Sequence, residues 1–104
     1  MNKTKKKLLE THGWKVGTVA ELLGMTSEDE ALVEIRLALS QQVRKRRMKK
    51  MTQSELAVKL KSSQPRVAKV EAGDDSVSID LLMRALLATG ASPKEIGKTI
   101  AAVG

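Results

Sequence analysis

The residues best suited to chemistry in this chain are cations and amides gathered near its middle. Ten lysines and arginines fall between positions 44 and 69 against one acid, Glu55, in a chain of net charge +7. They are Arg44, Lys45, Arg46, Arg47, Lys49, Lys50, Lys59, Lys61, Arg66 and Lys69. This concentration predicts a surface that binds a polyanion. For the run 44–50 alone, the plain alternative is a solvated helix end, which cations favour because of the helix dipole.

Two kinds of contact with nucleic acid are expected from these side chains. The amide of Gln64 can form a paired hydrogen bond with adenine, and Arg66 and Lys69 suit the guanine acceptors. The cations that can only neutralise phosphates are Arg44, Arg47, Lys49 and Lys50. Because of the helix pitch, one or two of these four are expected not to reach DNA.

Other chemistries find no support in the sequence. The chain has no Cys, so disulfides and thiolate metal sites are excluded, and its one histidine, His12, has no second ligand or nucleophile at a recognisable spacing. We find no paired acid and base and no phosphate loop, and expect neither catalysis nor a metal or cofactor. Trp14 is the one aromatic residue, which argues against single-stranded nucleic acid, whose bases stack on aromatic rings.

Two short helices must position the polar side chains. Thr52 and Glu55 form a capping box that starts the first helix, and Ser63 caps a second helix, which has Pro65 in its first turn and ends at Gly73. Isolated helices this short are unstable in water, so they must be held by packing against neighbours. The pattern over 52–73 predicts a helix-turn-helix, whose second helix fits the major groove of double-stranded DNA.

Three further helices are expected around this motif. A capping box of Ser27 and Glu30 opens a long amphipathic helix over about 27–48. A helix capped by Ser78 runs to near Gly90, and a last helix begins at Ser92. All strong periodic segments have helical spacing, which predicts an all-α bundle of about five helices.

The N-terminal part is expected to form an extension, residues 1–25, before a single DNA-binding domain at 26–104. It combines a basic tail with a short helix from Thr18, and Trp14 is interpreted as a hydrophobic anchor on the long helix. The basic start lacks the apolar stretch of a signal peptide, and no apolar run reaches the length of a membrane span. We therefore expect a cytoplasmic protein with no membrane contact.

The motif residues together resemble a known family, the Cro and phage-repressor-like helix-turn-helix domains of the xenobiotic-response-element type. The matching segments are TQSELA (52–57), Leu60, SQPRV (63–67), Val70 and EAG (71–73). The resemblance covers about residues 32–90 and implies a lambda-repressor-like bundle. The stretch 13–39 resembles the N-terminal extension of a subgroup that contains antitoxins of the HigBA type.

The resemblance also implies roles for individual residues. It implies that Gln64, Arg66 and Lys69 face base edges. The phosphate contacts that it adds are Gln53, Ser62 and Ser63. It further implies a structural salt bridge between Arg46 and Glu71.

Three positions depart from the family pattern. Lys61 stands where the family usually has glycine, and a non-glycine residue in the left-handed conformation costs roughly 1 kcal/mol. Asp74 and Asp75 stand where basic residues are common, and phosphates would repel them. We expect this loop to point away from DNA or to weaken binding.

The sequence predicts a sequence-specific regulator that binds double-stranded DNA as a homodimer and represses transcription. The alternative is an antitoxin that neutralises a partner toxin protein and autoregulates its operon. The last helix, with Ile96, Ile100 and Val103, is either the dimer contact or a cap on the core of its own domain.

Overall fold

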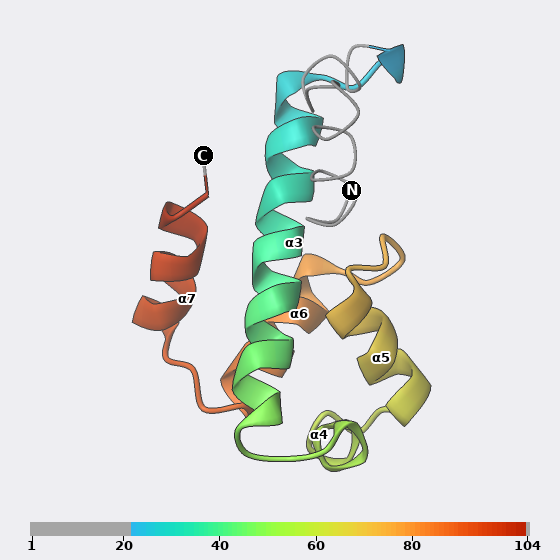
Figure 1. Ribbon diagram of the computed structural model, residues 1–104, viewed down its shortest axis with the longest axis vertical. Helices are drawn as coiled ribbons and strands as arrows, with labels where there is room; N and C mark the ends of the chain where they lie inside the picture. The colour runs from blue at the N-terminus through green and yellow to red at the C-terminus, as the bar shows by residue number, and fades with distance from the viewer. Residues whose placement is uncertain (1–21, 104) are drawn as a thin grey trace.

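The computed structural model describes residues 22–103, and five α-helices make up most of that part (Figure 1). The helices are α3 (Ser27–Met48), α4 (Gln53–Lys59), α5 (Gln64–Ala72), α6 (Ile79–Ala88) and α7 (Pro93–Ala101). Residues 22–103 contain no strand, and the predicted all-α bundle of five helices is confirmed. The expectations for His12, Trp14 and the helix from Thr18 concern residues outside the described part.

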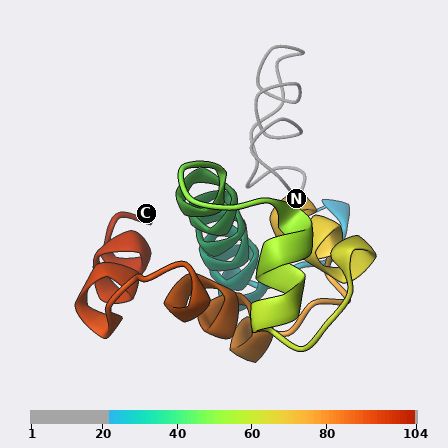
Figure 2. The same ribbon diagram turned by 90° about the horizontal axis from the view of Figure 1, so that it is seen from below.

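The long helix α3 is the support on which the other elements pack. Its 22 residues span about 33 Å, and α5, α6 and α7 each lie against it. α4 packs against α5 and α6 near the C-terminal end of α3 (Figures 1 and 2). The core that joins the helices contains Leu39, Val43, Leu56, Val67, Val70, Leu82, Leu86 and Ile96.

Local capping fixes where the helices begin. The capping box predicted for Thr52 with Glu55 is present, and Ser63, Ser78 and Ser92 cap α5, α6 and α7. One expected box, Ser27 with Glu30, is wrong: Thr26 caps α3 and its partner is Asp29. Both registers place a hydroxyl three residues before an acid, and the extended backbone at position 26 (φ −80°, ψ 168°) decides between them.

Two residues in the left-handed conformation end the motif helices. Lys61 (φ 52°) follows α4, and the amide of Ser62 donates to the carbonyl of Ala57 at 2.9 Å, which completes a Schellman motif. Gly73 (φ 74°) ends α5 in the same way. A Cβ at position 73 would lie 3.0 Å from Cδ2 of Leu37, so glycine also allows α5 to approach α3 closely.

The last helix covers the core of its own domain. Ile96 is 8% exposed and belongs to the core, and Ile100 packs against it half-buried. The apolar side of α7 is thus used within the chain, which favours the second of the two roles expected for this helix. Within residues 22–103, every helix falls short of the length and apolarity that a membrane span requires.

Candidate nucleic-acid interface

α5 turns one side toward the core and the other toward solvent. Val67 and Val70 are 1% exposed, whereas Gln64, Arg66 and Lys69 are all exposed. The capped, proline-containing start of α5 fixes its first turn, and contact with α3 and α4 fixes its orientation. The three side chains that were predicted to meet base edges therefore all lie outside the core.

These three side chains do not share one narrow face of α5. At about 100° of rotation per residue, Gln64 and Arg66 lie about 160° apart around the helix axis. Lys69 and the exposed ring of Pro65 lie between them, opposite the buried valines. A groove that receives the middle of this face would meet Pro65 and Lys69, with Gln64 and Arg66 at its two flanks.

Pro65 was missed as a surface residue, because in the sequence it served only as a helix-start signal. The spacing of Val67 and Val70 could have revealed its place, since a residue midway around the opposite side must face outward. An apolar ring at this point can contact a thymine methyl group.

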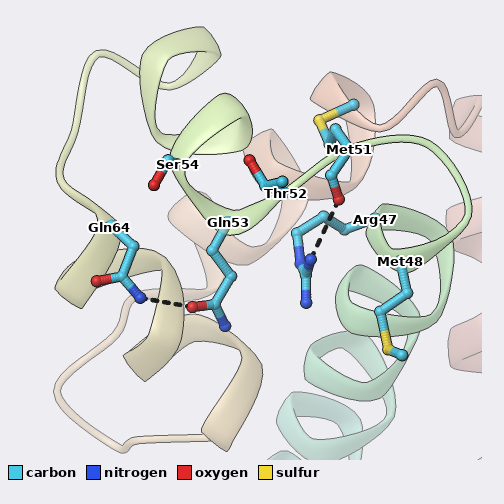
Figure 3. A pocket seen from close by; sticks show the side chains of 7 residues that line it. All are labelled: Arg47, Met48, Met51, Thr52, Gln53, Ser54 and Gln64. Atoms are coloured by element: carbon cyan, nitrogen blue, oxygen red, sulfur yellow. Dashed lines mark hydrogen bonds between the residues drawn. The ribbon is translucent and has the colours of Figure 1, made fainter.

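A chain of hydrogen bonds connects the start of α5 to α3. Nε2 of Gln64 donates to Oε1 of Gln53 at 2.6 Å (Figure 3). Nε2 of Gln53 donates in turn to Oε1 of Glu71 at 3.1 Å. The structure thus brings together Gln53 and Gln64, which were assigned to phosphate and base respectively.

The salt bridge expected between Arg46 and Glu71 is wrong by one residue. Glu71 pairs with Arg47, whose Nε donates to Oε2 of Glu71 and whose Nη2 donates to Oε1 at 2.9 Å. The side chain of Arg47 is 12% exposed and that of Glu71 is 4% exposed. Arg46 instead pairs with Glu95 of α7 at 2.8 Å. One residue along a helix is a rotation of about 100°, which carries Arg46 to the α7 side of α3 and Arg47 to the α5 side.

Two of the four cations expected at phosphates are engaged within the chain. Arg47 holds Glu71, and its Nη1 also donates to the carbonyl of Met51 at 3.1 Å (Figure 3). Nζ of Lys50 donates to the carbonyl of Thr89 at the end of α6, at 2.9 Å. Both contacts stabilise the domain, and cations tied in this way are poorly placed to neutralise phosphates.

The other two cations of that set, Arg44 and Lys49, are exposed. Arg44 lies about 60° from Arg47 around α3 and therefore on the α5 side, whereas Lys49 lies about 160° from Arg47. Of the two, Arg44 is the better placed to contact DNA that lies along α5. Near the turn, Ser62 is half-buried, and Oγ of Ser63 accepts from the amide of Arg66 at 3.3 Å.

An open depression lies where α3 ends and where α4 and α5 begin. Figure 3 shows the side chains that line it: Arg47, Met48, Met51, Thr52, Gln53, Ser54 and Gln64. The polar groups of Gln53 and Gln64 meet within it, and Met48 supplies an exposed apolar wall. Gln53 thus lies beside the exposed start of α5.

The loop between α5 and α6 carries the two unexpected acids. Hydrogen bonds from Ser76 lower the pKa of Asp74, and the nearby charge of Lys69 lowers it further. Nη2 of Arg36 donates to the backbone carbonyls of Asp75, at 2.9 Å, and of Val77. The loop is therefore fixed to α3, with a negative charge close to one of the cations of α5.

No cluster of acids or histidines in residues 22–103 has the arrangement of a metal site. Apart from Glu55, the exposed polar groups of the motif are amides, hydroxyls and cations, which are the groups that contact bases and phosphates. Fold and surface together define a helix-turn-helix protein.

Comparison with known proteins names the family. The family model described as Helix-turn-helix matches residues 42–96, more than half of the chain, and the chain therefore belongs to this family. Its members are DNA-binding transcriptional regulators of the Cro and phage-repressor type, similar to those of the xenobiotic-response-element type. Searches of curated proteins and of solved structures found no significant match. The predicted family is confirmed, and the antitoxin subgroup stays a prediction.

Proposed function

We propose that the protein is a sequence-specific regulator that binds double-stranded DNA as a dimer and represses transcription. The observation that carries this proposal is the outer side of α5, where Gln64, Arg66 and Lys69 are exposed while Val67 and Val70 anchor the helix in the core. An exposed helix of this composition fits the major groove.

In this proposal, some side chains contact bases and others contact phosphates. Gln64 pairs with an adenine at one flank of the face, Lys69 with guanine acceptors at its middle, and Arg66 with a guanine acceptor at the other flank. The groups that meet phosphates are Arg44, Gln53, Ser62 and Ser63. The buried Arg47–Glu71 pair holds the motif in position and does not itself contact DNA.

A single motif of this size meets few base pairs, so we propose that two copies act together. The same groove faces one side of B-DNA once per turn, which places the two α5 helices about 34 Å apart. Because α7 uses Ile96 within its own core, the dimer contact must involve another surface or the outward side of α7.

The proposal is tested by selecting binding sites from a randomised DNA library with the full-length protein. A palindromic consensus whose half-sites are about 10 base pairs apart supports a sequence-specific dimer. If the selected sequences share no consensus and the protein binds all of them with the same affinity, sequence-specific binding is rejected. Sedimentation at micromolar concentration with and without the selected DNA measures the dimer directly.

The antitoxin function is a second candidate. The family match begins at residue 42, so the first part of α3 lies outside the matched region, and Leu32 in it is 47% exposed. A toxin protein bound there would be neutralised by the same chain that represses its operon. Co-expression with the product of a small neighbouring gene tests this role, and separation of the two proteins during purification would exclude it.

A further inference from the structure

A carboxylate below the surface of the motif is linked by hydrogen bonds to the exposed first residue of α5. Oε1 of Glu71 accepts from Nη2 of Arg47 at 2.9 Å and from Nε2 of Gln53 at 3.1 Å. Oε1 of Gln53 accepts from Nε2 of Gln64 at 2.6 Å. Glu71 is 4% exposed, whereas Gln64 is exposed at the start of α5.

The carboxylate dictates which way round the Gln53 amide lies. A carboxylate paired with a guanidinium can only accept hydrogen bonds, so the group that Gln53 turns toward Glu71 must be its NH2. The carbonyl of Gln53 must then face the opposite side, where Gln64 lies. With the reverse orientation, the Gln53 oxygen would meet the carboxylate, and the desolvated acceptors would be left unpaired.

The orientation of Gln53 sets what Gln64 can offer to DNA. Since Oε1 of Gln53 accepts, Gln64 must donate one N–H to it, which leaves its second N–H and its carbonyl oxygen free. One donor beside one acceptor matches adenine, which presents N7 as acceptor and N6 as donor. Guanine presents two acceptors, N7 and O6, and one of them would face the Gln64 oxygen.

We infer that Glu71 is a positioning residue for base specificity: through Gln53 it fixes the donor and acceptor pattern of Gln64 in the form that selects adenine over guanine. The inference rests on the proposed function and adds to it a residue that does not itself reach DNA. Glu71 thereby has two roles, because its pair with Arg47 also stabilises the fold.

The test replaces Glu71 by the nearly isosteric glutamine and compares base preferences. Glutamine can donate as well as accept, so Gln53 can turn round, and Gln64 can then point two N–H groups at guanine. Sites are selected from a randomised library with wild-type protein and with Glu71→Gln. At the position whose preference is lost in Gln64→Ala, the wild type should favour adenine over guanine by about 5- to 100-fold. In Glu71→Gln this ratio should fall close to one.

Two further variants separate positioning from stability. Arg47→Lys weakens the ion pair but keeps the carboxylate, so it should lower stability while retaining the preference for adenine. Gln53→Met breaks the chain of hydrogen bonds and leaves the ion pair intact. It should therefore lose the preference as Glu71→Gln does, and it gives an answer even where Glu71→Gln does not fold.

The outcomes distinguish this inference from the proposed function. Adenine preference retained in Gln53→Met, or in a folded Glu71→Gln, would overturn the role of Glu71. Preference lost equally in Arg47→Lys would also overturn it, because the effect would then follow stability. A wild-type protein without any base preference that depends on Gln64 would instead reject the proposed reading of DNA by α5.

Discussion

Arg47 of α3 and Glu71 of α5 form an ion pair that is nearly closed to solvent, with side chains 12% and 4% exposed. The pair joins the end of the long helix to the end of the exposed helix, and Gln53 of α4 donates to the same carboxylate. One buried acid thus ties together three helices. The orientation of α5 relative to the rest of the domain depends on it.

The first prediction concerns the stability of this pair. Arg47→Met leaves the Glu71 carboxylate buried without its cation, which should lower the free energy of unfolding by about 3 to 5 kcal/mol. The matched control is Arg46→Met, whose partner Glu95 is 47% exposed, and its cost should be below about 1 kcal/mol. Urea unfolding of both variants measures the difference. Equal losses would contradict the assignment of Arg47 as the buried partner.

The second prediction concerns the turn of the motif. Lys61 has a left-handed backbone (φ 52°), which strains any residue except glycine. Lys61→Gly removes this strain, but glycine also loses more conformational entropy when the chain folds. The net effect should be a free energy of unfolding higher by about 0.5 to 1 kcal/mol. Lys59→Gly removes the same charge from right-handed helix and should lower the melting temperature. If Lys61→Gly lowers it as well, position 61 is not strained.

The third prediction separates two exposed cations, Arg44 of α3 and Lys49, which follows its last residue. Arg44→Ala should weaken binding to every DNA sequence and reduce the salt slope by about 1, because Arg44 lies on the α5 side. Lys49→Ala removes the same charge from the far side and should leave the slope unchanged. Affinities at several salt concentrations test both variants. A larger effect for Lys49 would place the DNA on another side of α3.

The fourth prediction concerns the acid beside α5. Hydrogen bonds from Ser76 lower the pKa of Asp74, so its carboxyl is ionised at neutral pH and repels phosphates. Asp74→Asn should therefore raise the affinity for any DNA, and the gain should shrink at high salt. Asp80→Asn makes the same change of charge at the exposed start of α6 and should raise the affinity less. An equal gain would indicate only an effect of net charge.

The sign of the pH dependence follows from the same lowered pKa. A carboxyl whose pKa is lower in the folded than in the unfolded protein stabilises the fold above its unfolded pKa. That contribution is lost as the pH falls through the folded pKa of Asp74. Because Asp74→Asn lacks the group, its stability should depend less on pH in the acidic range. Acid titration of both proteins by circular dichroism measures this difference.

The sequence predicted those parts of the fold that short-range signals determine. Capping hydroxyls, an acid three residues later and a terminal glycine are local features, so the start of α4 and both ends of α5 followed from Thr52, Glu55, Ser63 and Gly73. The cap of α3 was misplaced by one residue, because Thr26 with Asp29 and Ser27 with Glu30 satisfy the same pattern.

The partners of the cations could not be predicted from short-range sequence signals. Whether Arg46 or Arg47 meets Glu71 depends on the rotation of α3 relative to α5, and a change of one residue reverses the answer. Similarly, Lys50 donates to the carbonyl of Thr89, 39 positions away, and composition shows nothing of such a contact. The cluster of charge predicts a binding surface, but the fold divides it into cations that are paired within the chain and cations that are exposed.

The central claim, that the exposed side of α5 reads DNA sequence, is tested most directly by Gln64→Ala. Its affinity and that of the wild type are measured for the selected site and for scrambled DNA of the same length, at one salt concentration. The claim predicts that the wild type prefers the selected site, and that the variant loses about 1 to 3 kcal/mol of this preference at a single base position while its affinity for scrambled DNA is unchanged. Equal loss of affinity for both DNAs would contradict it.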